Sequence, residues 1–184
     1  VTVLFHIRKR GENMNIELRS WTMADLQDLI RLCNEADRTY LSGRMPYPYT
    51  ESDGRWWLNM VSEHEGKDGI FRRICAAGRT VGNISVERKG DVFCRDGELG
   101  YVLDQAYWSK GIMSEAVRRI VPLAMETLDL LRISAQVYAP NIASCRVLEH
   151  NGFKREGLIP QAVWKDGQIY DLCLYGILRS VKND

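Results

Sequence analysis

The stretch from Glu98 to Leu128 most constrains what this chain can fold into. A strand-like run, Glu98-Leu99-Gly100-Tyr101-Val102-Leu103, leads into a short loop with Gly111 near its centre. Apolar side chains then recur at three- and four-residue steps, as on one face of an amphipathic helix: Ile112, Ala116, Ile120, Leu123, Ala124 and Leu128. The stretch is therefore predicted to be a strand, a glycine-centred loop and the start of a helix.

This predicted helix start is a candidate anion site. Free backbone N–H groups and the positive end of the helix dipole suit a phosphate group, and Gly111 would let the backbone approach it closely. Ser109 and Ser114 could add hydroxyl donors, and Lys110 could add a positive charge. A plain strand–loop–helix connection without a ligand fits the same residues. The chain contains neither G-x-x-x-x-G-K-[ST] nor G-x-G-x-x-G, so the two nucleotide phosphate-loop motifs do not apply.

Length and composition indicate one globular domain. The chain has 184 residues, of which 45% are hydrophobic, which is ordinary for a single domain. A net charge of +1, from 25 basic and 24 acidic residues, argues against a nucleic-acid-binding surface. No apolar run approaches the ~20 residues of a membrane span. Five scattered cysteines without a C-x-x-C pair and three scattered histidines suggest no disulfide framework and no metal site, and a reducing cytoplasm fits best.

The first 13 residues are interpreted differently from the rest of the sequence. Lys9 to Asn13 can be back-translated as a ribosome-binding-like stretch just before Met14. Residues 1–13 are therefore interpreted as an N-terminal extension that is not native, and residues 14–184 as the folded domain.

The order of elements along the domain is predicted from periodicity and turn residues. We expect strands over 15–19, 71–77, 80–88, 95–103, 133–138, 153–162 and 169–178, and helices from Thr22 to Ala36, from Thr50, from Ile112 to Leu130 and over 143–150. Asp166-Gly167 is a strong hairpin signal. Because a helix separates strands 95–103 and 133–138, these two are expected to be parallel neighbours.

Several large aromatic side chains are candidates for a substrate mouth, since aromatic walls are common in pockets. They are Tyr47 and Tyr49 in the loop before the second helix, Trp57 in that helix, and Trp164 beside the hairpin turn. Core packing is the other interpretation of these residues, and for tryptophan it is the more common one.

Three segments resemble the GNAT superfamily of acyl-CoA N-acyltransferases, and most closely its branch of bacterial ribosomal-protein N-terminal acetyltransferases. Glu98 to Leu103 resembles that branch's fourth strand, and Trp108-Ser109-Lys110-Gly111-Ile112-Met113-Ser114-Glu115-Ala116 resembles its W-G-K-G-x-[AG]-T-E-A loop. Asn141 to Phe153 resembles its N-x-x-S-x-x-[VL]-x-x-x-x-G-F helix. The likeness covers residues 15–180. It implies a single α+β domain, in which a mixed, mostly antiparallel seven-stranded sheet has a parallel splayed pair, strands 4 and 5, and helices on both faces.

The resemblance also implies a site. Acetyl-CoA would be the co-substrate and no metal would take part. The cofactor-binding residues would be Tyr101, Val102, Leu103, Trp108, Ser109, Lys110, Gly111, Ile112, Met113, Ser114, Asn141 and Ser144. Met113 stands where the branch has a small residue and could crowd the diphosphate. A tyrosine acid that many relatives carry on the last helix is absent, and Ser144 lies in that region.

The chemistry expected at this site is direct transfer of an acetyl group to an amine. Glu98 is the candidate base, since strand alternation puts it on the same face as Gly100 and Val102. A solvated strand carboxylate is the alternative for Glu98. A backbone N–H near Tyr101 or Val102 would polarise the thioester carbonyl, and Ser144 would protonate the leaving thiolate or serve only in packing or capping.

Other functions remain open from the sequence. A non-catalytic module that binds or senses acyl-CoA would share the loop, and an interaction domain would bind no cofactor. A covalent acyl-Cys145 with His150 as base is disfavoured, because a spacing of five puts the two on different helix faces. The acceptor could be a protein N-terminus or a small-molecule amine. The oligomeric state is not readable, and a homodimer is one candidate.

Overall fold

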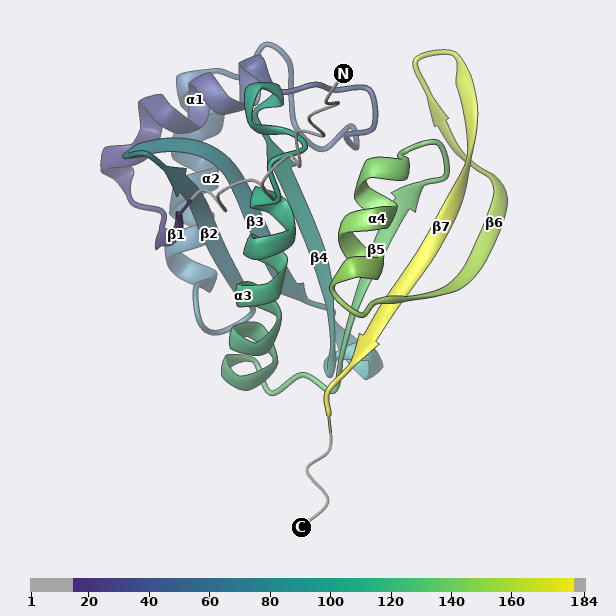
Figure 1. Cartoon of the computed structure of the whole chain (residues 1–184). Helices are drawn as coiled ribbons and strands as arrows, with labels where there is room; N and C mark the ends of the chain where they lie inside the picture. The colour runs from purple at the N-terminus through teal and green to yellow at the C-terminus, as the bar shows by residue number, and fades with distance from the viewer. Residues whose placement is uncertain (1–14, 181–184) are drawn as a thin grey trace, which may run out of the picture.

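The computed structural model describes residues 15–180, so the interpretation of residues 1–13 lies outside the described part. Seven strands form one sheet in the order β1-β2-β3-β4-β5-β7-β6, and four α-helices pack against it (Figure 1). The elements are β1 (Ile16–Ser20), α1 (Leu26–Glu35), α2 (Glu51–His64), β2 (Gly69–Ala76), β3 (Arg79–Arg88), β4 (Asp96–Leu103), α3 (Ile112–Thr127), β5 (Arg132–Tyr138), α4 (Ile142–His150), β6 (Lys154–Lys165) and β7 (Gln168–Leu178). Three short 3₁₀ turns, η1 (Met23–Asp25), η2 (Asp91–Phe93) and η3 (Gln105–Tyr107), complete them. The predicted α+β class and element order are confirmed.

The first two helices begin where the sequence predicts, at capping boxes. Thr22 and Asp25 exchange hydrogen bonds before α1, which is preceded by the η1 turn. Thr50 and Asp53 do the same before α2. Each pair satisfies backbone N–H groups that a helix start leaves without an intrahelical partner.

The sheet is antiparallel except at its centre. β1, β2, β3 and β4 pair in antiparallel order, as do β5, β7 and β6. A two-residue turn with positive φ at Asp166 (49°) and Gly167 (79°) joins β6 to β7, which is the backbone that a tight hairpin needs. The predicted parallel neighbours are β4 and β5.

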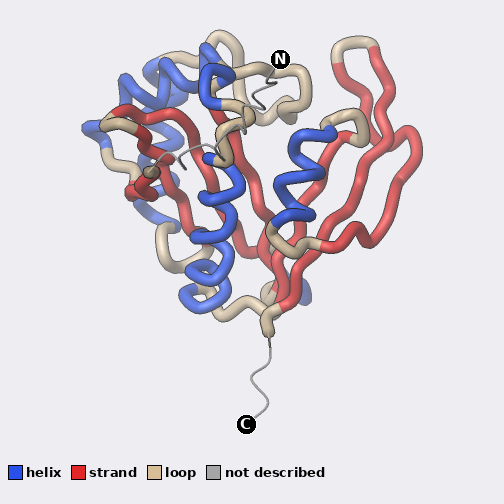
Figure 2. Tube along the Cα trace, in the orientation of Figure 1, coloured by secondary structure: helices blue, strands red, loops and turns tan. Residues whose placement is uncertain are grey.

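The parallel pair is short, and the sheet splits beyond it. β4 and β5 pair only over Asp96–Glu98 and Arg132–Ser134. Past that point the two strands diverge, as the arrows in Figure 1 and the red tube in Figure 2 show. The sheet therefore has two arms, β1–β4 and β5–β7, which are joined at one end and open at the other.

Each face of the sheet carries its own packed core. The larger core joins α3 and α4 to the strands, with Ile120, Leu148 and Ile133 almost fully buried. The smaller core lies under α1 and α2 and includes Leu32 and Phe71. The helices thus lie on both faces, as predicted, and the open end of the split remains free to form a site.

Candidate active site

The split between the two arms is a cleft of about 1210 Å³. It is lined by the diverging parts of β4 and β5, by the loop before α3, by the first half of α4 and by residues of the α1–α2 connection. All twelve predicted cofactor-binding residues line this cleft, from Tyr101 on β4 to Ser144 on α4. The structure therefore gathers into one space the three segments on which the family resemblance was based.

The loop before α3 leaves that helix start open. Gly111 is the N-cap residue with φ of 76°, in the left-handed region, and Ser109 has φ of 58°. Two neighbouring side chains are held away from the helix start by hydrogen bonds to the backbone. Trp108 Nε1 donates to Leu103 O at 2.9 Å, and Lys110 Nζ donates to Ala106 O at 2.7 Å. A 16-residue helix with an open N-terminus presents N–H groups and a positive dipole end. The free N–H groups at this helix start could donate hydrogen bonds to a diphosphate.

The first turn of α3 contributes backbone more than side chain. Met113 is buried in the larger core with 6% of its surface exposed, so its bulk lies in the core, and this does not support the expected crowding of the diphosphate. Ser114 Oγ accepts a hydrogen bond from Asn151 Nδ2 at 3.0 Å. Its own hydroxyl hydrogen remains available to a ligand, because a hydroxyl both donates and accepts.

The start of α4 meets β4 across the cleft. Asn141 caps the helix by accepting from Ser144 N at 3.2 Å, which leaves its amide N–H₂ group as a donor toward the cleft. Tyr101 Oη donates to Ser144 O at 3.4 Å. Burial raises the pKa of Tyr101 to about 12, so its phenol is neutral at physiological pH and can act as a hydrogen-bond donor. The half-buried Ser144 side chain lies at the same wall.

Glu98 lies at the fork of the split sheet. Its Cα partners are Glu87 on β3 and Ser134 on β5, and Ser134 marks the end of the parallel pairing. The Glu98 side chain is half-buried and lines the cleft. A carboxylate at this point can take a proton from a group that enters between the arms.

The four aromatic residues expected at a substrate mouth do not line the cleft. Tyr49 is buried in the smaller core, and Trp57 packs edge to face against Trp21 and Phe71. Tyr47 and Trp164 are exposed, by 68% and 72%, on outer surfaces. For Tyr49 and Trp57, core packing is the interpretation that the structure favours.

The first part of the connection between α1 and α2 crosses the open end of the cleft. Residues 37–44, here called the strap, supply Asp37, Thr39, Tyr40, Leu41, Ser42 and Arg44 to the lining. Gln105 Nε2 donates to Asp37 Oδ2 at 2.8 Å, which ties the strap to the β4 arm. Lys165 Nζ donates to the carbonyl oxygens of Arg38 and Thr39, which ties it to the β6–β7 hairpin. Sequence periodicity carried no signal for these long-range contacts.

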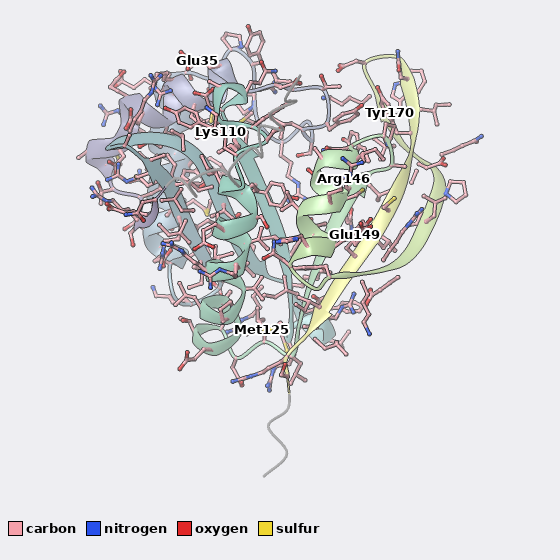
Figure 3. The ribbon with its side chains drawn as sticks, viewed as in Figure 1. Glu35, Lys110, Met125, Arg146, Glu149 and Tyr170 are labelled. Atoms are coloured by element: carbon pink, nitrogen blue, oxygen red, sulfur yellow. The ribbon has the colours of Figure 1, made fainter. Side chains whose placement is uncertain are left out.

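Other side chains can be placed with respect to the cleft. Figure 3 shows Lys110 on the loop before α3 and Arg146 on α4, and both line the cleft. Tyr40 of the strap packs edge to face on Tyr138 and Tyr170. Cys145 is buried with 7% exposure, whereas His150 is exposed at the end of α4. This separation gives no support to an acyl-cysteine mechanism.

These features define a class of protein. A sheet that splits between two parallel strands exposes strand edges that can pair with an extended ligand. The open start of α3 at the same cleft suits a phosphate at one end of that ligand. The fold and the cleft together are those of a protein that holds a long, phosphate-bearing cofactor between its strands.

Comparison with known proteins gives the family. Residues 15–154 match the family described as "Acetyltransferase (GNAT) domain", and the chain belongs to this family. It is 40% identical over 131 residues to a probable N-acetyltransferase of Bacillus subtilis, YjcK, an alignment that covers 66% of this chain and 71% of the relative. Some other curated relatives are matched over only about half of their own length.

Two further relatives belong to the ribosomal-protein branch. The ribosomal-protein-serine acetyltransferase of Escherichia coli is 26% identical over 144 residues, covering 76% of this chain and 79% of the relative. A solved structure of RimL, a ribosomal L7/L12 alpha-N-protein acetyltransferase in complex with coenzyme A, superposes with a TM-score of 0.78 at 21% identity. That superposition covers 89% of this chain and 93% of RimL.

The chain is thus an N-acetyltransferase of the GNAT family that uses acetyl-CoA. The relatives reported above are all named as acetyltransferases, which gives no support to the non-catalytic alternative. Within residues 15–180, no three His, Cys, Asp or Glu side chains gather as a metal site would require. Over the same residues, no helix is both long and apolar enough to cross a membrane.

Proposed function

We propose that this enzyme transfers an acetyl group directly from acetyl-CoA to a primary amine while both substrates are bound. The amine is the α-amine of a protein N-terminus or that of a small molecule. The observation that carries this proposal is the position of Glu98 at the fork of the cleft, with the open start of α3 at the other end of the exposed β4 edge. Such an arrangement can hold an extended thioester beside a base without a covalent enzyme intermediate.

The length of the exposed strand supports this placement. From Glu98 to Leu103, β4 advances five residues, or about 17 Å at 3.3 Å per residue. A phosphopantetheine arm is of comparable length, so an arm whose diphosphate lies at Gly111–Ser114 would bring its thioester toward Glu98. Asn141 would hold the arm from α4, and the exposed edges of β4 and β5 would pair with its amides.

The chemistry at the fork is proton transfer and charge stabilisation. The bound cofactor supplies the activated acetyl group. Glu98, acting through a water molecule, would accept a proton from the ammonium of the acceptor. A backbone N–H near Tyr101 or Val102 would donate to the acyl oxygen as negative charge develops there. Ser144 would then donate a proton to the leaving sulfur as the carbon–sulfur bond breaks, and would recover a proton, through water, from the nitrogen that becomes the amide.

The need for a base depends on the acceptor. The pKa of a lysine-like amine is more than three units above pH 7, so its deprotonation at that pH costs roughly 4–5 kcal/mol. The pKa of an α-amine is within about one unit of pH 7. Glu98 therefore matters most for strongly basic acceptors. The names of the ribosomal-protein relatives support a protein N-terminus as one acceptor class. Acetyl-CoA and the free cysteines of the described part favour work in a reducing cytoplasm.

Release of free coenzyme A thiol with a panel of acceptors tests the proposal. The panel contains short peptides with a free N-terminus, the same peptides with a blocked N-terminus and one lysine, and alkylamines. We expect turnover with at least one unblocked amine.

Two variants test the residues at the fork. Glu98→Gln should lower kcat and remove the acid limb of its pH–rate profile. Ser144→Ala should lower kcat with little change in the KM for acetyl-CoA. An unaltered profile in Glu98→Gln, or unaltered turnover in Ser144→Ala, would remove that residue's role.

A further inference from the structure

Two glutamates lie side by side on the wall of the cleft, exposed Glu87 and half-buried Glu98, and only Glu98 has a role in the proposed mechanism. Glu87 on β3 is the direct antiparallel partner of Glu98 on β4, and both line the cleft. Residues directly opposite in such a pair share one face of the sheet, with Cβ atoms about 5 Å apart. Val102, which is four residues from Glu98 and so points to the same face of β4, packs against the smaller core. Both carboxylates therefore lie on the α1–α2 face, away from α3 and α4.

Neither carboxylate is neutralised by the protein. Within residues 15–180, neither glutamate takes part in an ion pair of 4 Å or less, and Glu87 accepts only a long hydrogen bond from Ser85 Oγ, at 3.5 Å. The cationic neighbours on the same stretch are engaged elsewhere: Arg88 donates to Leu128 O, and Lys89 donates to Asp96 and Ser134. Like charges directly opposite on a sheet destabilise it.

The surface beside the two glutamates is open and shaped to receive a group. Gly100 follows Glu98 on the same face, and a Cβ added there would meet only Ser85 Oγ, at 3.8 Å. Ser85 is buried, with 7% exposure, and its hydroxyl is directed at Glu87. There is thus space next to both carboxylates, at the fork where the acceptor must meet the acyl group.

We propose that Glu87 is a specificity-determining residue, which together with Glu98 receives the cationic amine of the acceptor. This inference rests on the proposed function and adds that the acceptor binds as its ammonium form. An ammonium has three N–H donors and no acceptor, and carboxylates accept strong, charge-assisted hydrogen bonds. Neutral hydroxyl acceptors and anionic acceptors are disfavoured by the same pair of charges.

The proton balance follows from this geometry. The bound ammonium loses one proton, through water, to the Glu98 carboxylate. The N–H bond breaks, its electron pair becomes the lone pair of the neutral amine, and an O–H bond forms. Glu87 takes no part in the proton transfer and continues to accept hydrogen bonds from the remaining N–H groups, so the amine keeps its place as it becomes a nucleophile.

Binding and stability can be measured before any natural acceptor is known. The probe is butylammonium chloride, compared with sodium chloride of equal ionic strength and with 1-butanol, on the full chain saturated with coenzyme A. We expect butylammonium alone to raise the Tm of the wild type, and Glu87→Gln to lose most of that rise. Without amine, Glu87→Gln should itself have a raised Tm, because the like-charge pair is removed. Glu63→Gln, on the exposed face of α2, is the matched control and should change neither quantity.

Kinetics with any amine that the enzyme acetylates provide the second readout. Glu87→Gln should raise the KM for the amine by at least tenfold and change the KM for acetyl-CoA by less than twofold, and Glu87→Asp should recover part of the loss. The proposal is overturned if butylammonium does not shift the wild type, or if Glu87→Gln leaves the amine response and the amine KM unchanged. An enzyme that binds butylammonium through Glu87 but acetylates no amine would instead overturn the proposed function alone.

Discussion

At the scale of single residues, the cofactor end of the cleft depends on backbone conformation more than on side-chain chemistry. Gly111 takes a φ of 76° at the start of α3, and the side chains of Trp108 and Lys110 are held back from it by hydrogen bonds to Leu103 and Ala106. The helix end is open because of this loop shape. A residue with a Cβ at position 111 would strain the loop and narrow the approach to the N–H groups.

Gly111→Ala should therefore reduce both stability and cofactor binding. A non-glycine residue in the left-handed region costs about 1–2 kcal/mol, and coenzyme A affinity should fall by roughly tenfold or more as the loop shifts. Gly167→Ala in the β6–β7 turn is the control, since its φ is 79° and nothing lies within 4 Å of an added Cβ. Urea unfolding and calorimetric titration with coenzyme A measure the two effects. Equal coenzyme A affinity in both variants would contradict the role given to Gly111.

Glu115 supplies a pH-dependent contribution to stability. Hydrogen bonds from Arg118, and then from Arg119, lower the pKa of Glu115 to about 2, and Arg119 also donates to Ile16 O on β1. Because the folded pKa lies below the ordinary value of 4.5, the contribution is present above pH 4.5 and is lost as the pH falls toward 2.

Glu115→Gln should lower the free energy of unfolding at pH 7 by about 1 kcal/mol, since these are largely surface pairs on one helix. The difference from the wild type should shrink between pH 4.5 and about 2. Glu126→Gln, at an exposed position of the same helix, serves as the control. Urea titrations at pH 7 and at pH 3 make the comparison, and a deficit that persisted undiminished at the lower pH would argue against this assignment.

At the scale of elements, the strap is the connection between the two arms at the open end of the cleft on the α1–α2 face. Strand pairing joins the arms only at Asp96–Glu98 and Arg132–Ser134. The strap reaches Gln105 on one side and Lys165 on the other, and Tyr40 packs on Tyr138 and Tyr170. An acceptor that approaches Glu98 from this face must pass beside it.

Lys165→Met should loosen the strap without unfolding the domain, because it removes the donor to the carbonyls of Arg38 and Thr39. Hydrogen exchange of amides 37–44 should become several-fold faster, while exchange in the core strands stays slow. Lys154→Met changes an exposed lysine on the same strand and should leave the strap unaffected. Unchanged exchange in Lys165→Met would show that other contacts hold this segment.

At the scale of the whole molecule, a sheet with a core on each face lets a cofactor enter between strands without disrupting either core. The large core under α3 and α4 includes residues of both arms of the sheet, whereas the smaller core under α1 and α2 packs on the β1–β4 arm. The strand edges that face the cleft are the part of the sheet that folding leaves for a ligand to cover.

Coenzyme A should consequently stabilise the entire domain. At 100 times its dissociation constant, a ligand adds about 2.7 kcal/mol to the free energy of unfolding, which for a domain of this size corresponds to roughly 5–11 °C in Tm. Thermal unfolding of the full chain with and without coenzyme A measures the shift. A Tm that did not respond to saturating coenzyme A would contradict the cleft as a cofactor site.

Much of the fold could be predicted because its signals are local. The capping boxes at Thr22 and Thr50 and the Asp166-Gly167 turn lie within a few residues of the structure that they specify. The parallel pairing of β4 and β5 followed from the helix between them. The positions of the aromatic residues were harder to predict, because a tryptophan such as Trp57 has the same sequence signature whether it packs in a core or lines a pocket.

The sequence by itself determined the order of the elements, the glycine-centred loop before α3 and the segments that line the cleft, since periodicity, turn chemistry and motif spacing act over short stretches of chain. Only the tertiary structure decided that residues 37–44 cross the open end of the cleft and that Glu87 stands opposite Glu98. Both depend on the register and packing of strands and loops far apart in the chain. Such long-range contacts are fixed by the folded sheet as a whole and leave no periodic signal in the sequence.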